Sequence, residues 1–133
     1  RAKIVTCLFK KYVGMNTKDF AKELYMTASD IKKLIKSGMY VGSHGYNHTW
    51  LGKEKLTEQL KDIKMSLKFL KNVGANLNKW IMCYPYGSYN KDTLKILKQN
   101  KCSIGLTTKV GLANIDKNKI LELNRLDTND FIQ

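Results

Sequence analysis

The two histidines of this chain, His44 and His48, lie four residues apart in the segment His-Gly-Tyr-Asn-His. Neutral imidazole is the commonest protein ligand of zinc and related divalent ions. If the segment makes one helical turn, this spacing turns both rings to the same side. Two histidines can also fall together by chance and merely cap a helix or fill a polar pocket. Because only two ligands are visible and the His-Glu-x-x-His motif is absent, the spacing alone leaves both interpretations open.

A second group of residues suited to chemistry is the run Tyr-Pro-Tyr-Gly-Ser-Tyr-Asn at positions 84–90, which contains the only proline of the chain. Proline fixes one φ angle and makes the preceding residue extended. A plain turn between a strand and a helix would explain Pro85 and Gly87, with Asn90 as a helix cap. It explains the three tyrosines less well, and tyrosine rings stack well on sugar faces. We therefore expect this run to bind a ligand.

Short apolar runs alternate with amphipathic stretches along most of the chain. The long stretch 54–72 follows the 3.6-residue helical period, and 91–99 reads as a second helix, after helical stretches within 1–25 and from Thr27 to Gly38. Strands are expected at 39–43, 79–83, 102–107 and 119–123. Strands that alternate with helices predict an α/β fold with a parallel sheet and right-handed crossovers.

In such folds ligands gather at the carboxyl ends of the strands. Polar residues follow all four expected strands at that end, namely His44 with His48, then Tyr84 to Gly87, then Thr107 with Thr108, and finally Arg125 with Asp127. Four separate loops therefore direct functional groups to one edge of the predicted sheet. This arrangement favours a functional site over chance clustering of the histidines.

Length and composition limit the class of protein. A chain of 133 residues with 43% apolar residues predicts one domain, 1–133, with a helical lead-in at 1–25 and an α/β region at 26–133. No apolar run approaches the ~20 residues that cross a bilayer, so a soluble protein without a membrane span is expected. Cys7, Cys83 and Cys102 form no disulfide pattern, which slightly favours the cytoplasm. The start at Arg1 leaves open a processed product or part of a longer protein.

The net charge of +13 raises the question of nucleic-acid binding. Only two residues are arginines, and the lysines are spread along the helical stretches instead of being interleaved with aromatic residues. A solvated lysine face is the simpler explanation, and no nucleic-acid partner is expected. An anionic polymer or lipid headgroup could still be attracted to such a surface.

Two segments together resemble a known family. Gly-Ser-His-Gly-Tyr-Asn-His-Thr-Trp-Leu at 42–51 and Cys-Tyr-Pro-Tyr-Gly-Ser-Tyr-Asn at 83–90 look like the second and third motifs of the polysaccharide deacetylases, the NodB-homology or carbohydrate esterase 4 group. The resemblance implies a distorted, partial (β/α) barrel and metal-dependent removal of acetyl groups from N-acetylated sugars in a polysaccharide or related glycan. It also implies that His44 and His48 bind a divalent metal, most often zinc.

By the same resemblance, the run Tyr84, Pro85, Tyr86 and Gly87 binds the glycan substrate, and a backbone N–H near Tyr86 is offered to the oxyanion of the reaction. An arginine often precedes the Pro-Tyr of the third motif, but Cys83 or Tyr84 stands there in this chain. We hypothesise that Arg125 from the next loop supplies the missing charge and orients a carboxylate such as Asp127. A surface ion pair is the alternative, and the general acid stays unassigned because no third histidine exists.

The family's first motif, Thr-Phe-Asp-Asp-Gly, supplies the general base and the third metal ligand, and this chain does not contain it. The expected barrel therefore lacks its first strands, and this chain alone is expected to be an incomplete or inactive hydrolase. A non-catalytic carbohydrate-binding protein that keeps the fold is one alternative, and a basic domain that binds anionic polymers is another.

An exposed sheet edge is a further consequence of missing strands. Unpaired backbone groups at such an edge recruit other strands. We predict that the chain forms homo-oligomers through this edge, and a monomeric sedimentation coefficient at micromolar concentration would contradict that prediction.

Overall fold

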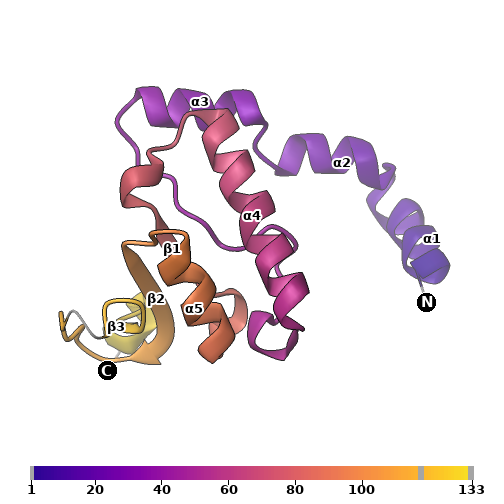
Figure 1. Cartoon of the computed structure of the whole chain (residues 1–133). Helices are drawn as coiled ribbons and strands as arrows, with labels where there is room; N and C mark the ends of the chain where they lie inside the picture. Colours follow the sequence, from indigo (N-terminus) through magenta and orange to yellow (C-terminus); the bar gives the residue numbers. More distant parts are fainter. Residues whose placement is uncertain (1, 117–118, 132–133) are drawn as a thin grey trace. The chain divides into compact units, whose positions relative to one another are not determined.

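The computed structural model describes residues 2–116 and 119–131 and divides the chain into two compact units, 1–39 and 40–133 (Figure 1). The division falls later than the expected end of the helical lead-in at residue 25, and the single-domain prediction stays a prediction. None of the helices in the described part of the chain is both long and apolar enough to cross a membrane.

The first unit consists of three helices, α1 (Ala2–Val13), α2 (Thr17–Leu24) and α3 (Ala28–Lys36). The start of the predicted helix at Thr27 is confirmed by a capping box, in which Asp30 N donates to Thr27 Oγ1 (3.2 Å) and Thr27 N donates to the Asp30 carboxylate (3.1 Å). Gly38, with φ of 84°, ends the helix as predicted.

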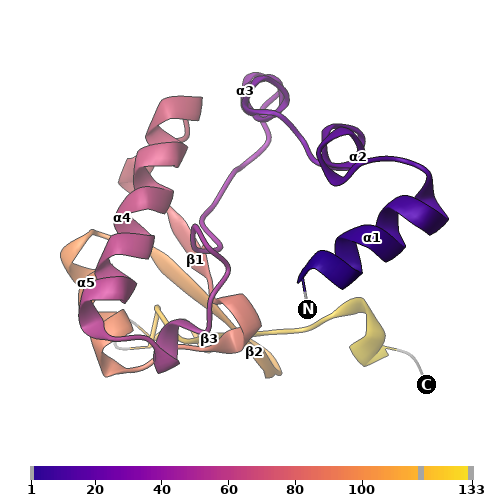
Figure 2. The same cartoon turned by 90° about the vertical axis from the view of Figure 1, so that its right-hand side faces the viewer.

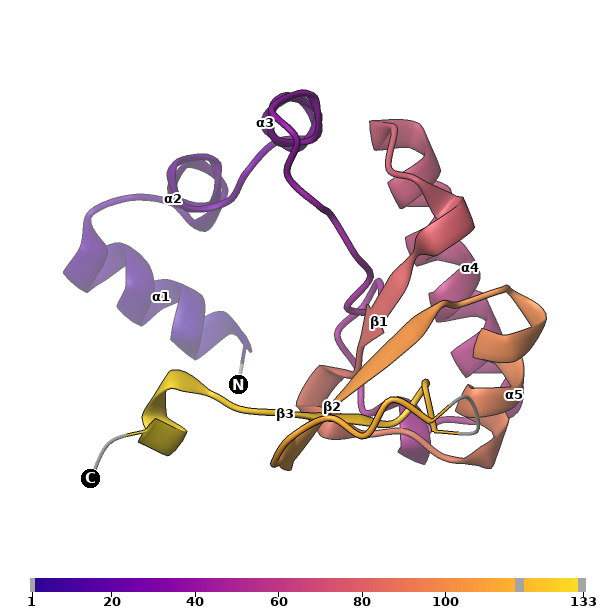
Figure 3. The same ribbon diagram turned by 90° about the vertical axis from the view of Figure 1, so that its left-hand side faces the viewer.

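The second unit contains a parallel sheet in the order β1 (Ile81–Cys83), β2 (Ile104–Val110) and β3 (Leu123–Arg125) (Figure 3). The α/β prediction is confirmed, and the sheet formed by the described residues is open, not a closed barrel. The predicted strands at 79–83 and 102–107 are confirmed within two or three residues of their ends. The predicted strand at 119–123 is wrong in its bounds, because pairing with β2 begins only at Leu123.

Helices α4 (Leu56–Val73) and α5 (Lys91–Gln99) confirm the two predicted helices of this unit and lie on the same side of the sheet (Figures 2 and 3). Gly74 ends α4 in a left-handed conformation (φ 88°), and Asn90 caps α5 by accepting from Thr93 N (3.0 Å). The core between helices and sheet is formed by Leu51, Ile63, Trp80, Met82, Tyr84, Ile96, Leu97 and Leu121.

The predicted strand at 39–43 is the main error in the fold. The structure gives only an isolated parallel bridge between Ser43 and Met82, held by Ser43 N to Ile81 O and Cys83 N to Ser43 O, both 2.8 Å. The Tyr40 side chain is 55% exposed, and its hydroxyl donates to Lys79 O. The start of this segment is therefore not packed into the core, and it does not pair with β1. Ser43, the residue directly before His44, nevertheless lies beside β1. The predicted site required this position, because it places His44 next to the end of β1.

Candidate metal centre

The two imidazoles meet at the end of β1. His44 Nδ1 lies 2.8 Å from Cys83 O, and His44 Nε2 lies 3.1 Å from His48 Nε2. Because a carbonyl oxygen only accepts, His44 Nδ1 carries the proton, and the lone pair of the neutral ring is at Nε2. A hydrogen bond of this kind fixes the tautomer and the direction of a metal-binding imidazole. The lone pair of His44 therefore points at the His48 ring.

The histidines are brought together by a turn of irregular backbone, not by the helical turn that their spacing suggested. Gly45 has φ of 72°, and His48 has φ of 54°. The left-handed conformation costs a residue with a side chain about 1–2 kcal/mol. Such strained residues cluster at functional sites, where the surrounding structure holds them in place.

Tyr86 lies against the same ring pair. Its ring centroid is 4.7 Å from that of His48, and its backbone is also left-handed (φ 56°) inside the short turn Pro85–Gly87. The other neighbour of Tyr86 is Trp50, stacked at 4.6 Å with 5° between the ring planes, and the Lys53 ammonium lies 4.8 Å from the Trp50 centroid. Tyr86 and Trp50 are 51% and 47% exposed, so a ligand can reach both.

The other predicted substrate-binding residues have different surroundings. The Tyr84 side chain is 2% exposed, its hydroxyl donates to Leu121 O (2.6 Å), and its ring stacks on Tyr89. Burial raises the pKa of the Tyr84 hydroxyl well above its ordinary value. Pro85 is buried too. The side chains of Tyr84 and Pro85 are buried and shape the loop, and the role of these two residues in substrate binding stays a prediction.

Gly87, Arg125 and Asp127 are the remaining predicted site residues. Gly87 has φ of 65°, and an added Cβ would overlap the Thr108 side chain, so these two predicted loops are in contact. Thr108, Arg125 and Asp127 line a hollow of about 220 Å³. Hydrogen bonding from the Asn129 backbone lowers the pKa of the exposed Asp127 carboxyl. The proposed catalytic roles of Arg125 and Asp127 stay predictions.

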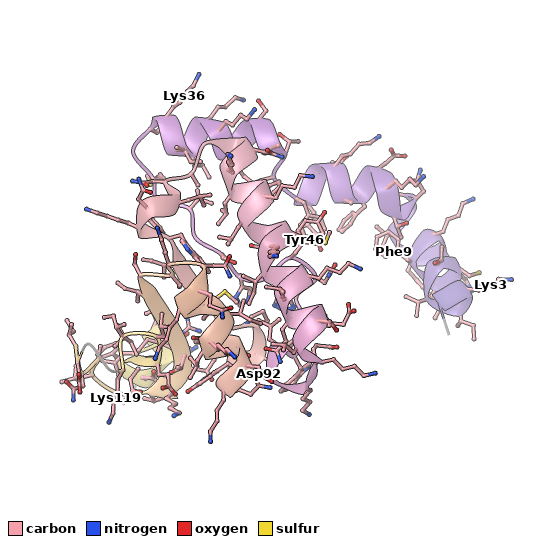
Figure 4. All side chains as sticks on the ribbon, viewed as in Figure 1. Lys3, Phe9, Lys36, Tyr46, Asp92 and Lys119 are labelled. Carbon is pink, nitrogen blue, oxygen red and sulfur yellow. The ribbon has the colours of Figure 1, made fainter. Side chains whose placement is uncertain are left out.

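Asp62 of α4 contacts the histidine loop and was missed by the sequence reasoning. Its carboxylate accepts from Tyr46 N and Asn47 N, both at 2.8 Å. The signal was available, because Gln59, Asp62 and Ser66 recur at helical spacing among the apolar residues of α4, and all three are buried. Tyr46 itself lies beside α4 and lines a hollow there with Met65 and Phe69 (Figure 4).

The chemistry of the donor set fits a divalent metal in part. Two imidazoles whose ε-nitrogens face each other at 3.1 Å suit zinc, which takes nitrogen ligands readily. A catalytic zinc site has three protein ligands. Within 2–116 and 119–131, no group of three histidine, cysteine, aspartate or glutamate side chains is placed to hold a metal ion. His44 and His48 would therefore be two ligands of a larger set.

Comparison with known proteins settles the family. A sequence profile described as polysaccharide deacetylase matches residues 1–104. The chain belongs to the polysaccharide deacetylase family. The match includes the histidine loop and the Tyr-Pro-Tyr-Gly run of this family member, and it ends before Arg125 and Asp127.

Relatives of this deacetylase-family chain agree with the assignment. It is 27% identical over 115 residues to the putative polysaccharide deacetylase YxkH of Bacillus subtilis, covering 83% of this chain and 41% of YxkH. It is also similar to the Streptococcus pyogenes deacetylase PplD, solved in complex with acetate (TM-score 0.69, 29% identity), covering 91% of this chain and 49% of PplD. The chain thus spans less than half the length of either relative.

A third comparison concerns the fold alone. A family 4 carbohydrate esterase from Streptomyces lividans, also solved with acetate, aligns with a TM-score of 0.53 and 18% identity, over 57% of this chain and 39% of the esterase. Together with the similarity to PplD, it supports a partial deacetylase-type fold for this chain.

Proposed function

We propose that this chain contributes two metal ligands and one wall of the substrate groove to the metal-dependent N-deacetylation of N-acetylated sugars in a polysaccharide or related glycan. The observation that carries the proposal is the pair of facing ε-nitrogens of His44 and His48 beside the exposed ring of Tyr86. Membership of the polysaccharide deacetylase family supports the reaction class. Zinc is the metal that we expect, since the visible ligands are imidazoles.

The residues of this chain would prepare the site in three ways. The Cys83 carbonyl holds His44 in the tautomer whose Nε2 lone pair is available. The turn at 85–87 would direct the Tyr86 backbone N–H at the oxygen on which negative charge develops during hydrolysis. The exposed rings of Tyr86 and Trp50 would contact the sugar. When bound, a divalent ion would polarise the acetyl carbonyl and lower the pKa of a water molecule toward neutrality.

A general base is also required, and the carboxylate beside the histidine loop is already engaged. Asp62 approaches the histidine loop, but its two oxygens accept from the backbone of Tyr46 and Asn47. We therefore propose that the base and a further ligand come from another segment, and that residues 1–133 alone bind metal without efficient hydrolysis.

Two measurements test this proposal. Zinc titration of the purified chain is expected to give binding at one site per chain, and acetate release from N-acetylated oligosaccharides is expected to be slow with this chain and rapid with the complete protein. Failure of the chain to bind zinc, or absence of acetate release by the complete zinc-loaded protein, would contradict the proposal. Oligosaccharide binding in that second case would instead support the non-catalytic carbohydrate-binding alternative, which the exposed Trp50–Tyr86 stack also permits.

Arg125 provides a separate prediction within this function. If Arg125 orients a carboxylate such as Asp127 at the site, Arg125→Ala in the complete protein should lower turnover by about 10-fold or more and leave zinc content unchanged, because charge-assisted contacts contribute strongly where charge develops. Steady-state acetate release and metal analysis check this. Lys109→Ala, a neighbouring exposed charge on β2, is the control. Unchanged turnover in Arg125→Ala would leave only a surface role for the arginine.

A further inference from the structure

We infer that Asp62 is the positioning residue of the histidine loop: its carboxylate holds the backbone between His44 and His48 so that the two imidazoles face each other. Asp62 belongs to α4, far from both histidines in the sequence. The inference extends the proposed function, because it assigns the geometry of the metal pair to a helix that contributes no ligand.

The hydrogen bonds of Asp62 are concentrated on this loop. One carboxylate oxygen accepts from Tyr46 N and the other from Asn47 N, each at 2.8 Å. These are consecutive amides, and they lie between Gly45 and His48, where the chain reverses. A carboxylate that bridges two neighbouring N–H groups fixes the orientation of both peptide planes. Asp62 on α4 thereby determines the direction of the backbone that leads into His48.

Burial makes this interaction strong. Asp62 is 3% exposed, and a buried carboxylate is costly unless hydrogen bonds compensate for the loss of water. The loop also packs directly on the carboxylate, since a Cβ added to Gly45 would lie 3.0 Å from Asp62 Oδ1 and 3.3 Å from Pro85 Cγ. Only a glycine with its φ of 72° allows the backbone to approach this closely.

A second contact from α4 fixes the start of the loop. Ser66, one helical turn after Asp62, forms a 2.7 Å hydrogen bond with the Ser43 hydroxyl, and Gly45 N donates to the same Ser43 hydroxyl (3.3 Å). Ile63 and Leu70 anchor α4 itself in the core. The helix therefore holds the loop both just before His44 and between the two histidines, and it acts as a rigid support for them.

The test compares Asp62→Asn with Gln59→Leu in the purified chain. Asparagine keeps the size of the side chain, but its amide nitrogen would face one loop N–H, so one of the two hydrogen bonds is lost. Gln59 is the matched control, because it is a buried polar residue one turn earlier on α4 that does not bond to the histidine loop. Its amide nitrogen donates to Glu54 O and Asn90 Oδ1, and its amide oxygen accepts from Thr93 Oγ1. Both variants should lower Tm.

Hydrogen exchange of the Tyr46 and Asn47 amides and titration with zinc ions are the two readouts. Asp62→Asn should lose protection at the amide that faces the new NH2 group and bind zinc about 10–100-fold more weakly, the range found when groups that orient metal ligands are removed. Gln59→Leu should keep both the protection and the zinc affinity. If Asp62→Asn does not fold, Ser66→Ala provides the milder test and should weaken zinc binding about 3–10-fold for the same reason.

The outcomes separate this inference from the proposed function. Equal zinc affinity in the wild type and Asp62→Asn, or equal losses in Asp62→Asn and Gln59→Leu, would overturn the positioning role. If the wild-type chain binds no zinc, the proposed function fails. In that case loss of amide protection in Asp62→Asn alone would still support the positioning of the loop, and unchanged protection would overturn it.

Discussion

Replacing His48 with alanine is expected to lower the zinc affinity of the chain by at least about 100-fold, which corresponds to about 2.7 kcal/mol. His48 Nε2 is one of only two nitrogen donors that face each other at the site, 3.1 Å from His44 Nε2. Groups that merely orient a ligand already change metal affinity about 10–100-fold, so removal of a ligand should cost at least as much. Isothermal titration calorimetry with zinc ions measures this change in affinity directly.

The matched control for His48→Ala is Asn47→Ala. Asn47 is exposed, lies in the same loop and contributes its backbone N–H to Asp62, which alanine retains. Zinc affinity in Asn47→Ala should stay within about threefold of the wild type, since no ligand or orienting group is removed. Similar losses in both variants would mean that the loop had been distorted in general. Unchanged affinity in His48→Ala would exclude His48 as a ligand.

The histidine pair was predictable from the sequence, but the way in which the chain assembles it was not. The spacing of His44 and His48 and their position after a strand pointed to one site. The segment does not make the helical turn that would have placed both rings on one side; it has left-handed backbone at Gly45 and His48 instead. Local spacing could not predict this conformation, because it is held by the buried carboxylate of Asp62 from another element.

The tyrosine-rich run shows a similar limit. Its composition predicted a binding loop, and Tyr86 is exposed beside His48 as expected. Tyr84 has the same side chain and is two residues away, yet it lies in the core with its hydroxyl bonded to Leu121 O. On regular extended backbone two residues this far apart would share a face, so the difference comes from the turn Pro85–Gly87, where Tyr86 has left-handed backbone (φ 56°). The sequence alone did not show that Tyr84 would pack against the segment that precedes β3.

Sheet boundaries were least predictable where pairing depends on a distant segment. The strand expected at 39–43 forms only the bridge at Ser43, and the strand expected at 119–123 begins at Leu123. Apolar composition alone suggested both strands. A strand also needs a partner along its whole length, and the sequence of one segment does not specify where that partner begins.

Gly105→Ala is expected to destabilise the second unit by about 2–6 kcal/mol. Gly105 is a buried residue of β2 that pairs with Met82, and an added Cβ would lie 2.6 Å from the Tyr84 hydroxyl oxygen and 2.7 Å from the Leu121 carbonyl carbon. An overpacked core costs about 1–3 kcal/mol. Moving Leu121 away would also break the buried hydrogen bond from Tyr84, at a further cost of about 1–3 kcal/mol.

Chemical denaturation of Gly105→Ala beside Gly74→Ala tests this expectation. Gly74 has φ of 88° with no atom within 4 Å of an added Cβ, so alanine there adds only backbone strain of about 1–2 kcal/mol. Gly105 is not among the glycines with positive φ, so a larger loss of stability in Gly105→Ala than in Gly74→Ala is due to the steric overlap. Because Tyr84 is two residues from Tyr86, displacement of the Tyr84 ring should also disturb the turn beside His48, so zinc binding should weaken in Gly105→Ala and not in Gly74→Ala. A free energy of unfolding in Gly105→Ala no lower than that in Gly74→Ala would mean that β2 can move away from Leu121 at little cost, contrary to the close packing described above.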